Sequence, residues 1–138
     1  MMATTDNLAT KYLKWLTDNI KEQPLENGWR EIATPFLDQF YDGITVYARE
    51  NGDCITLSDD GVTANNTICL GGPLQQKKMA AFRMFLKQYG IEVTDNGEML
   101  MNTSHDKYPI HFHLFLQAIV SANEIFSPGL LQKVKCEM

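Results

Sequence analysis

Four aspartates flank a stretch of sequence that alternates like a β-hairpin, and together they could support metal-dependent chemistry. Asp38 and Asp42 precede this stretch, and Asp59 and Asp60 end it in the sequence DDG. Several carboxylate oxygens can hold Mg²⁺ or Mn²⁺, and such an ion can activate water for phosphodiester hydrolysis. If the hairpin brings the two pairs together, the chain is a metal-dependent nuclease or phosphodiesterase with these four residues as catalytic ligands.

Aspartates beside glycine are also what turns and strand ends require. Asp38 can bond backbone N–H groups near the first strand, and Asp59 and Asp60 can shape the turn before Gly61. No Glu-x-Lys element follows the strand as a nuclease site would require. We therefore expect the aspartates to be structural, with no metal or cofactor bound, and keep the nuclease as the alternative.

Histidine and cysteine supply two further candidate sites. His111 and His113 are two residues apart, and on one helix such side chains point about 200° apart, so both cannot ligate the same metal. His111 is instead expected to pair with Asp106 or to lie near the positive end of the helix dipole. Cys54 could meet His105 or His111 as a nucleophile and base, but no local signature supports this pair.

The chain has 138 residues, of which 44% are hydrophobic and 21% charged, and a formal net charge of −5. This length suits one core, so we expect a single domain over residues 1–138. The negative charge makes nucleic acid an unlikely partner because DNA and RNA binding depends on neutralising phosphates. A weaker alternative is a winged-helix-like unit whose Lys77, Lys78, Arg83 and Lys87 face phosphate.

Three cysteines, Cys54, Cys69 and Cys136, have no C-x-x-C spacing and fit neither a disulfide framework nor a zinc site. They predict reduced thiols in a cytoplasmic protein. The first residues lack the cationic start and apolar run of a signal peptide, and no apolar stretch is long enough to span a membrane. We expect no membrane association.

Periodicity predicts the elements that position these residues. Apolar residues recur on one helical face in 5–22, with Thr5 or Asp6 as N-cap, and again in 74–89 and 109–125. Residues 29–33 predict a first strand, and Asn-Gly turns predict two hairpins, at 42–61 and 91–102. Residues 23–28 and 62–73 are expected to be loops. The prediction is an α+β fold in which three helices cover one face of a small, mainly antiparallel sheet.

The apolar positions of these elements predict one shared core. Its expected members are Phe36, Ile44, Val46, Ile55, Leu57, Phe82, Phe85, Leu86, Phe112, Leu116 and Ile119. The alternate positions of the first hairpin, including Tyr47, Arg49 and Thr56, then form a polar or functional face.

The segment from Trp29 to Gly61 resembles a bacterial and phage family catalogued as domain of unknown function 1828. The pattern consists of a TPF-D element, an aspartate before an alternating strand, and a closing DDG. It is carried here by Thr34, Pro35, Phe36, Asp38, Asp42, Asp59, Asp60 and Gly61. The order of the later elements also matches, so the resemblance covers most of residues 10–126. It implies no catalytic residues and is typical of compact accessory proteins of phages or mobile elements.

These observations favour a non-enzymatic protein-interaction or inhibitor module of phage type, with a host defence protein as its target. The expected contact surface combines Tyr47, Arg49 and Thr56 with the acidic turn residues Asp42 and Asp60.

Overall fold

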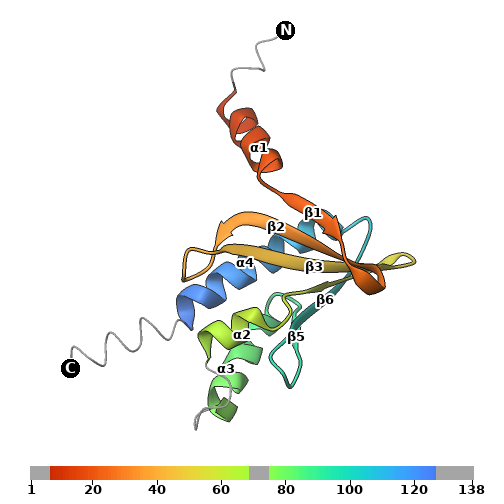
Figure 1. Ribbon diagram of the computed structural model, residues 1–138. Helices are drawn as coiled ribbons and strands as arrows, with labels where there is room; N and C mark the ends of the chain where they lie inside the picture. Colours follow the sequence, from red (N-terminus) through yellow and green to blue (C-terminus); the bar gives the residue numbers. More distant parts are fainter. Residues whose placement is uncertain (1–6, 69–74, 127–138) are drawn as a thin grey trace, which may run out of the picture.

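A six-stranded antiparallel sheet is the centre of the computed structural model, which describes residues 7–68 and 75–126 (Figure 1). The strands are β1 (Lys21–Pro24), β2 (Trp29–Leu37), β3 (Gly43–Asn51), β4 (Cys54–Ser58), β5 (Glu92–Val93) and β6 (Met99–Ser104). Their order in the sheet is β1-β2-β3-β4-β6-β5. The first four strands therefore form a meander, and the second hairpin joins it through β6. The predicted α+β class is confirmed.

Helices α2, α3 and α4 lie on one side of this sheet, and the long α4 crosses behind the strands (Figure 1). The described helices are α1 (Leu8–Asp18), α2 (Val62–Thr67), α3 (Gln75–Lys87) and α4 (Tyr108–Ile125). Helix α4 contacts β2, β4 and β6, α2 packs on α4, and α3 packs on β5. None of the helices in the described residues is both long and apolar enough to cross a membrane.

The hydrophobic core lies between these three helices and one face of the sheet. Eight of the predicted core residues are buried: Ile44, Val46, Ile55, Leu57, Phe82, Leu86, Leu116 and Ile119. The three predicted phenylalanines Phe36, Phe85 and Phe112 are partly buried and pack against this cluster. The alternation of β3 and β4 therefore predicted the core face correctly.

Helix α1 forms as expected but does not cover the sheet, so that prediction is wrong. It has no buried residue and projects past the edge strand β1 (Figure 1). Its start is also different, because the Asn7 side chain accepts hydrogen bonds from the backbone N–H groups of Ala9 and Thr10. The expected caps Thr5 and Asp6 lie outside the described residues.

Two segments predicted to be loops contain regular structure. Strand β1 pairs with β2, and its Pro24 is tolerated because an edge strand needs hydrogen bonds on one side only. Helix α2 forms although its sequence, VTANNT, is a weak helix former, because its Thr63, Ala64 and Thr67 are buried by tertiary packing. The predicted LGGP turn and Cys69 and Cys136 lie outside the described residues.

Both Asn-Gly turns are confirmed. Gly52 and Gly97 have φ of 65° and 88°, in the region that favours glycine. The hairpins that these turns close, β3–β4 and β5–β6, have the predicted antiparallel pairing.

Candidate functional site: a cleft on the open face of the sheet

The sheet face opposite the core carries the side chains predicted as a binding surface. Strand pairing places Tyr47 beside Ser58 and Arg49 beside Thr56. On the other side of β3, Trp29 of β2 lies opposite Arg49. Because α2, α3 and α4 all pack against the other side of the sheet, this open face is not covered by them (Figure 1). Tyr47, Arg49 and Thr56 thus share one accessible surface, as predicted.

A cleft of about 490 Å³ hollows the open face where the β1–β2 turn approaches the ends of β4 and the β5–β6 hairpin. The lining residues come from β2, β3 and β4 and from these turns: Leu25, Glu26, Trp29, Tyr47, Ser58, Asp60 and Glu98. The cleft therefore combines one aliphatic and two aromatic side chains with three carboxylates.

The carboxylates give the cleft a negative potential. Glu98 accepts a hydrogen bond of 2.5 Å from the Ser58 hydroxyl. Glu26 and Asp60 make no hydrogen bond or ion pair through their carboxylates to the described part of the chain. Burial raises the pKa of Tyr47, and the charges of Glu31 and Asp60 raise it further. Tyr47 is thus held as a neutral phenol that can donate a hydrogen bond.

A cation lies at the margin of this cleft. The guanidinium of Arg49 is 5.6 Å from the ring centre of Trp29, within the range of a cation–π contact. The lining combines the carboxylates of Glu26, Asp60 and Glu98 with apolar and aromatic surface. Such a lining suits a cation that carries apolar groups, as a lysine or arginine side chain does.

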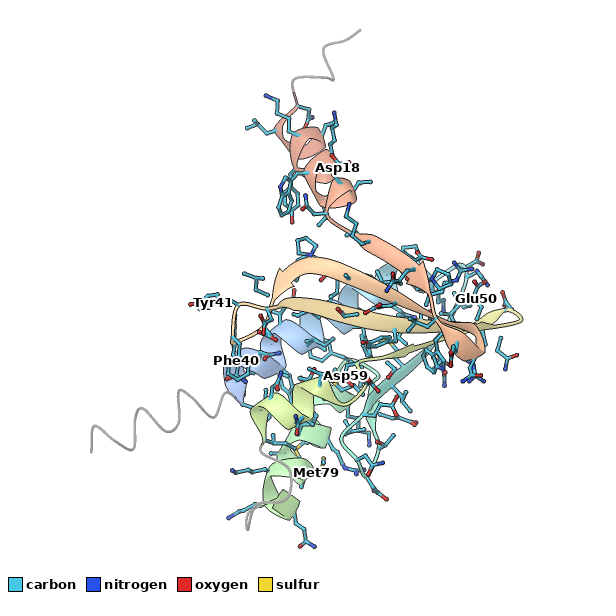
Figure 2. The ribbon with its side chains drawn as sticks, in the orientation of Figure 1. Asp18, Phe40, Tyr41, Glu50, Asp59 and Met79 are labelled. Atoms are coloured by element: carbon cyan, nitrogen blue, oxygen red, sulfur yellow. The ribbon has the colours of Figure 1, made fainter. Side chains whose placement is uncertain are left out.

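Asp59 lies away from this cleft and is almost completely buried, with 2% of its surface exposed, beside α2 under the sheet (Figure 2). Its Oδ1 accepts hydrogen bonds from the N–H groups of Gly61 and Met99, each 2.9 Å, and its Oδ2 accepts one of 3.0 Å from that of Thr63. Burial raises the pKa of Asp59, although these hydrogen bonds oppose the increase. Asp59 thus joins the end of β4 to β6 and to the first turn of α2.

Asp38 has a similar local role in the β2–β3 connection. Its Oδ1 accepts hydrogen bonds from the N–H groups of Phe40, at 2.8 Å, and Asp42, at 3.1 Å. Asp60 takes a positive φ of 60° in the turn before Gly61. The prediction that Asp38, Asp59 and Asp60 shape turns and strand ends is confirmed.

The four aspartates are not gathered around one point. In residues 7–68 and 75–126, no group of three or more His, Cys, Asp or Glu side chains is arranged to hold a metal ion. Of the four, only Asp60 lines the open-face cleft, and Asp42 is an exposed residue of the β2–β3 turn.

A family model described as "Domain of unknown function DUF1828" matches residues 34–122, which is more than half of the chain. The chain belongs to this DUF1828 family. No curated protein and no solved structure matches the chain. The match begins at residue 34, within β2, whereas the predicted resemblance began near residue 10. Helix α1, strand β1 and the cleft residues Leu25, Glu26 and Trp29 of this DUF1828 chain therefore lie outside the matched part.

The sequence did not single out Trp29, Glu26 or Glu98 as site residues. Trp29 could have been placed on the open face by extending the strand alternation backward from Ala33. Glu98 reaches the cleft because β6 pairs with β4, which brings the β5–β6 turn beside Ser58. No local signal in the sequence indicates that pairing.

The histidines of this DUF1828 chain occupy separate places. His111 lies in the first turn of α4, near the positive end of the helix dipole, which is one of its two predicted surroundings. The other prediction, a pairing with Asp106, is wrong, because the Nδ1 of His111 lies 2.5 Å from the hydroxyl oxygen of Thr103. His113 is exposed on α4. The two do not converge on one point, in agreement with the helical geometry.

The pairing of Cys54 with a histidine, which no sequence signature supported, is not formed among the described residues. Cys54 is exposed and lies opposite Ser104 in the β4–β6 ladder. The Nε2 of His105 lies 3.4 Å from a carboxylate oxygen of Glu50. His105 also lines a pocket with Ile55, on the opposite face of the sheet from Cys54. His111 is engaged with Thr103 instead.

Of the four cations of the basic helix α3, Arg83 is the one held by side-chain or carbonyl groups in the described part of the chain. Arg83 donates to the carbonyl of Thr94 and to the carboxylate of Asp95, both at 3.2 Å. These bonds join α3 to the β5–β6 hairpin, which gives Arg83 a structural role.

Proposed function

We propose that this DUF1828 chain is a non-enzymatic protein-interaction module whose open-face cleft binds a basic segment of a partner protein. The observation that carries the proposal is the composition of the cleft: Trp29 and Tyr47 beside the carboxylates of Glu26, Asp60 and Glu98. A lysine or arginine side chain suits this lining because its aliphatic stem can pack on the aromatic rings while its charge meets the carboxylates.

The charge of the molecule supports a basic partner. Residues 19–126 contain eight Lys and Arg and fourteen Asp and Glu, a formal net charge of −6. Such a field accelerates encounter with positively charged proteins and opposes approach to nucleic acid phosphates. Interfaces also concentrate binding energy in a few buried aromatic and charged contacts, of the kinds that the cleft offers.

The more specific form of the proposal is an inhibitor of phage or mobile-element type that acts in the cytoplasm. By covering a basic surface of a host defence protein, the module would block that surface sterically. A cytoplasmic location suits the exposed thiol of Cys54, which stays reduced there. The resemblance in the TPF-D and DDG segments supports this origin, and the cleft supplies the contact.

A titration with a defined basic probe tests the cleft. The probe is the peptide acetyl-Lys-Trp-Lys-Leu-Lys-amide, and its control is the same peptide with glutamate in place of lysine. In ¹H–¹⁵N spectra we expect saturable shifts at the Trp29 indole and at the amides of Asp60 and Glu98 with the basic peptide only. Binding of both peptides alike, or shifts spread over the whole surface, would refute the proposal.

Charge-removing variants complete this test. Asp60→Asn combined with Glu98→Gln should weaken binding of the basic peptide at least tenfold, because both charges are lost while Gln can still accept from Ser58. The matched control, Asp53→Asn combined with Asp106→Asn at two exposed turn residues outside the cleft lining, removes the same number of charges and should leave the affinity unchanged. Equal effects of the cleft and control variants would mean that only the overall charge matters.

A further inference from the structure

Helix α1 presents an apolar face that the described part of the chain does not cover. Leu8 is 79% exposed, and Tyr12 and Trp15 are each about half exposed. The rings of Tyr12 and Trp15 stack with their centroids 6.3 Å apart and an interplanar angle of 19°. Exposed aromatic and aliphatic side chains on one helical face are typical of a helix that docks in a groove.

Helix α1 does not lie in the cleft of its own chain. Only Asn19 and Ile20 connect α1 to β1, and Ile20 packs against the core. Asn19 also ends the helix, with its side-chain amide donating to the carbonyl of Trp15 at 2.8 Å. The helix leaves one end of β1, and the cleft begins at Leu25, just after the other end (Figure 1).

The charges of α1 and of the cleft are complementary. Helix α1 carries Lys11, Lys14 and Asp18, a net charge of +1, against −6 for residues 19–126. Neither lysine forms an ion pair with the described residues. Lys11 is four residues before Trp15, so the two side chains are neighbours on the helix surface. A cation beside an aromatic ring is the chemistry that the cleft accepts.

The areas also agree. An aromatic side chain presents roughly 150–250 Å², so half-exposed Tyr12 and Trp15 together offer about 200 Å², and two exposed leucines bring α1 to about 400 Å². Stable interfaces bury about 800 Å² on each partner. The area buried by one helix in one cleft is therefore too small for a stable interface. When each partner contributes both a helix and a cleft, the area buried on each partner is about twice as large and reaches that size.

We propose that two copies of this chain form a reciprocal dimer in which α1 of each copy lies in the open-face cleft of the other. The inference rests on the proposed function, because it uses the same cleft. It adds regulation: the helix of the second copy is the basic segment that fills the cleft at rest, and a partner protein must displace it. The cleft then becomes accessible to a partner protein only when the dimer dissociates.

An anionic membrane is the other occupant that a basic amphipathic helix suggests. Two lysines give little attraction to anionic lipids, and the remainder of the molecule, at −6, is repelled by them. The observations therefore favour the acidic cleft of a second copy.

A charge-exchange experiment in the full chain tests the dimer. One variant carries Lys11→Glu and Lys14→Glu, and the other carries Glu26→Lys and Glu98→Lys. Each variant alone opposes like charges, so self-association should weaken at least tenfold in sedimentation velocity relative to the wild-type dimer expected at about 100 µM. An equimolar mixture pairs a negative helix with a positive cleft and a positive helix with a negative cleft, so it should restore a dimer.

Circular dichroism checks that both variants are folded. The helix variant should fold because α1 buries no residue, and Glu26 is exposed, whereas Glu98 is half-buried and accepts from the Ser58 hydroxyl. If Glu98→Lys unfolds the chain, Glu26→Lys alone replaces the double substitution, with the same expected outcomes. A monomeric wild type, a dimer that ignores both double substitutions, or a mixture that stays monomeric overturns the inference. So does co-sedimentation of the wild-type monomer with phosphatidylserine vesicles that Lys11→Glu with Lys14→Glu abolishes. If the chain is monomeric but still binds the basic peptide in its cleft, only the dimer fails; if it dimerises and the peptide neither binds nor competes, the proposed function fails.

Discussion

Replacing Asp59 with alanine should remove a large part of the stability of this protein. The change leaves the buried N–H groups of Thr63 and Met99 without their acceptor. The N–H group of Gly61 also loses its acceptor, but that bond is only partly buried. A buried donor without a partner costs about 1–3 kcal/mol, so the two buried donors of Thr63 and Met99 together correspond to roughly 2–6 kcal/mol. Removing the carboxylate also relieves its desolvation cost, which raises the pKa of Asp59. We therefore expect a net loss of about 2–4 kcal/mol, against a total of roughly 5–15 for a domain.

Urea unfolding followed by far-ultraviolet circular dichroism measures this loss, with Asp60→Asn as the control. Asp60 is exposed and asparagine tolerates its positive φ, so the control should stay within about 0.5 kcal/mol of wild type. Because the pKa of Asp59 is raised on folding, its proton-linked stability is complete below the ordinary value of 3.8 and is lost as pH rises through the folded value. The deficit of Asp59→Ala should thus be largest below pH 3.8 and shrink as the pH rises above that value. A loss below about 1 kcal/mol at every pH would refute the assigned role.

Four further outcomes are expected. Phe82→Ala should cost about 3–5 kcal/mol in chemical denaturation, because Phe82 is completely buried, and a loss under about 1 would contradict its place in the core. Gly52→Val should cost about 1–2 kcal/mol through its positive φ alone, since no atom lies within 4 Å of an added Cβ, and a thermal melt equal to wild type would disprove this. Burial, with a smaller effect from the charge of Glu22, raises the pKa of Tyr108 to about 12. The neutral phenol therefore contributes its full stability below pH 10.0, and this contribution is lost as the pH rises through about 12. Tyr108→Phe should remove a step near pH 12 from the ultraviolet titration, and removal of a step near pH 10 would contradict the raised pKa. EDTA should leave the melting temperature unchanged, whereas calorimetric binding of Mn²⁺ at micromolar affinity, lost in Asp42→Ala and in Asp60→Ala, would favour the nuclease alternative.

Local patterns predicted the elements of this fold better than their contacts. The alternation of Ile44, Val46 and Ala48 reports which face of a strand is apolar, and that face is buried. The same reasoning identified a helix around Tyr12 and Trp15, but periodicity shows only that a helix has an apolar face. What covers that face depends on the two residues that connect α1 to β1, and these carry the helix away from the sheet.

The missed elements depend on tertiary contacts. Helix α2 is stabilised by the buried Asp59 carboxylate at its first turn and by a hydrogen bond from the Thr67 hydroxyl to the carbonyl of Thr63. Strand β1 depends on pairing with β2, although its sequence includes a proline. The cleft was predictable only in part for the same reason: Tyr47 and Asp60 follow from the hairpin, whereas Glu98 reaches them through pairing across the sheet.

The position of β6 between β4 and β5 has a consequence for how the chain folds. The pairings β1–β2, β2–β3, β3–β4 and β5–β6 each join strands that are neighbours in the chain, so they can close locally and fast. The β4–β6 ladder joins distant residues, such as Ile55 and Thr103, and must pay a larger loop-closure entropy. Helix α4 follows β6 and contacts both β4 and β6, so this ladder aligns two of the strands that α4 covers. We expect the transition state for folding to contain the β4–β6 ladder, so that weakening the contact of Asp59 with Met99 slows refolding more than it speeds unfolding.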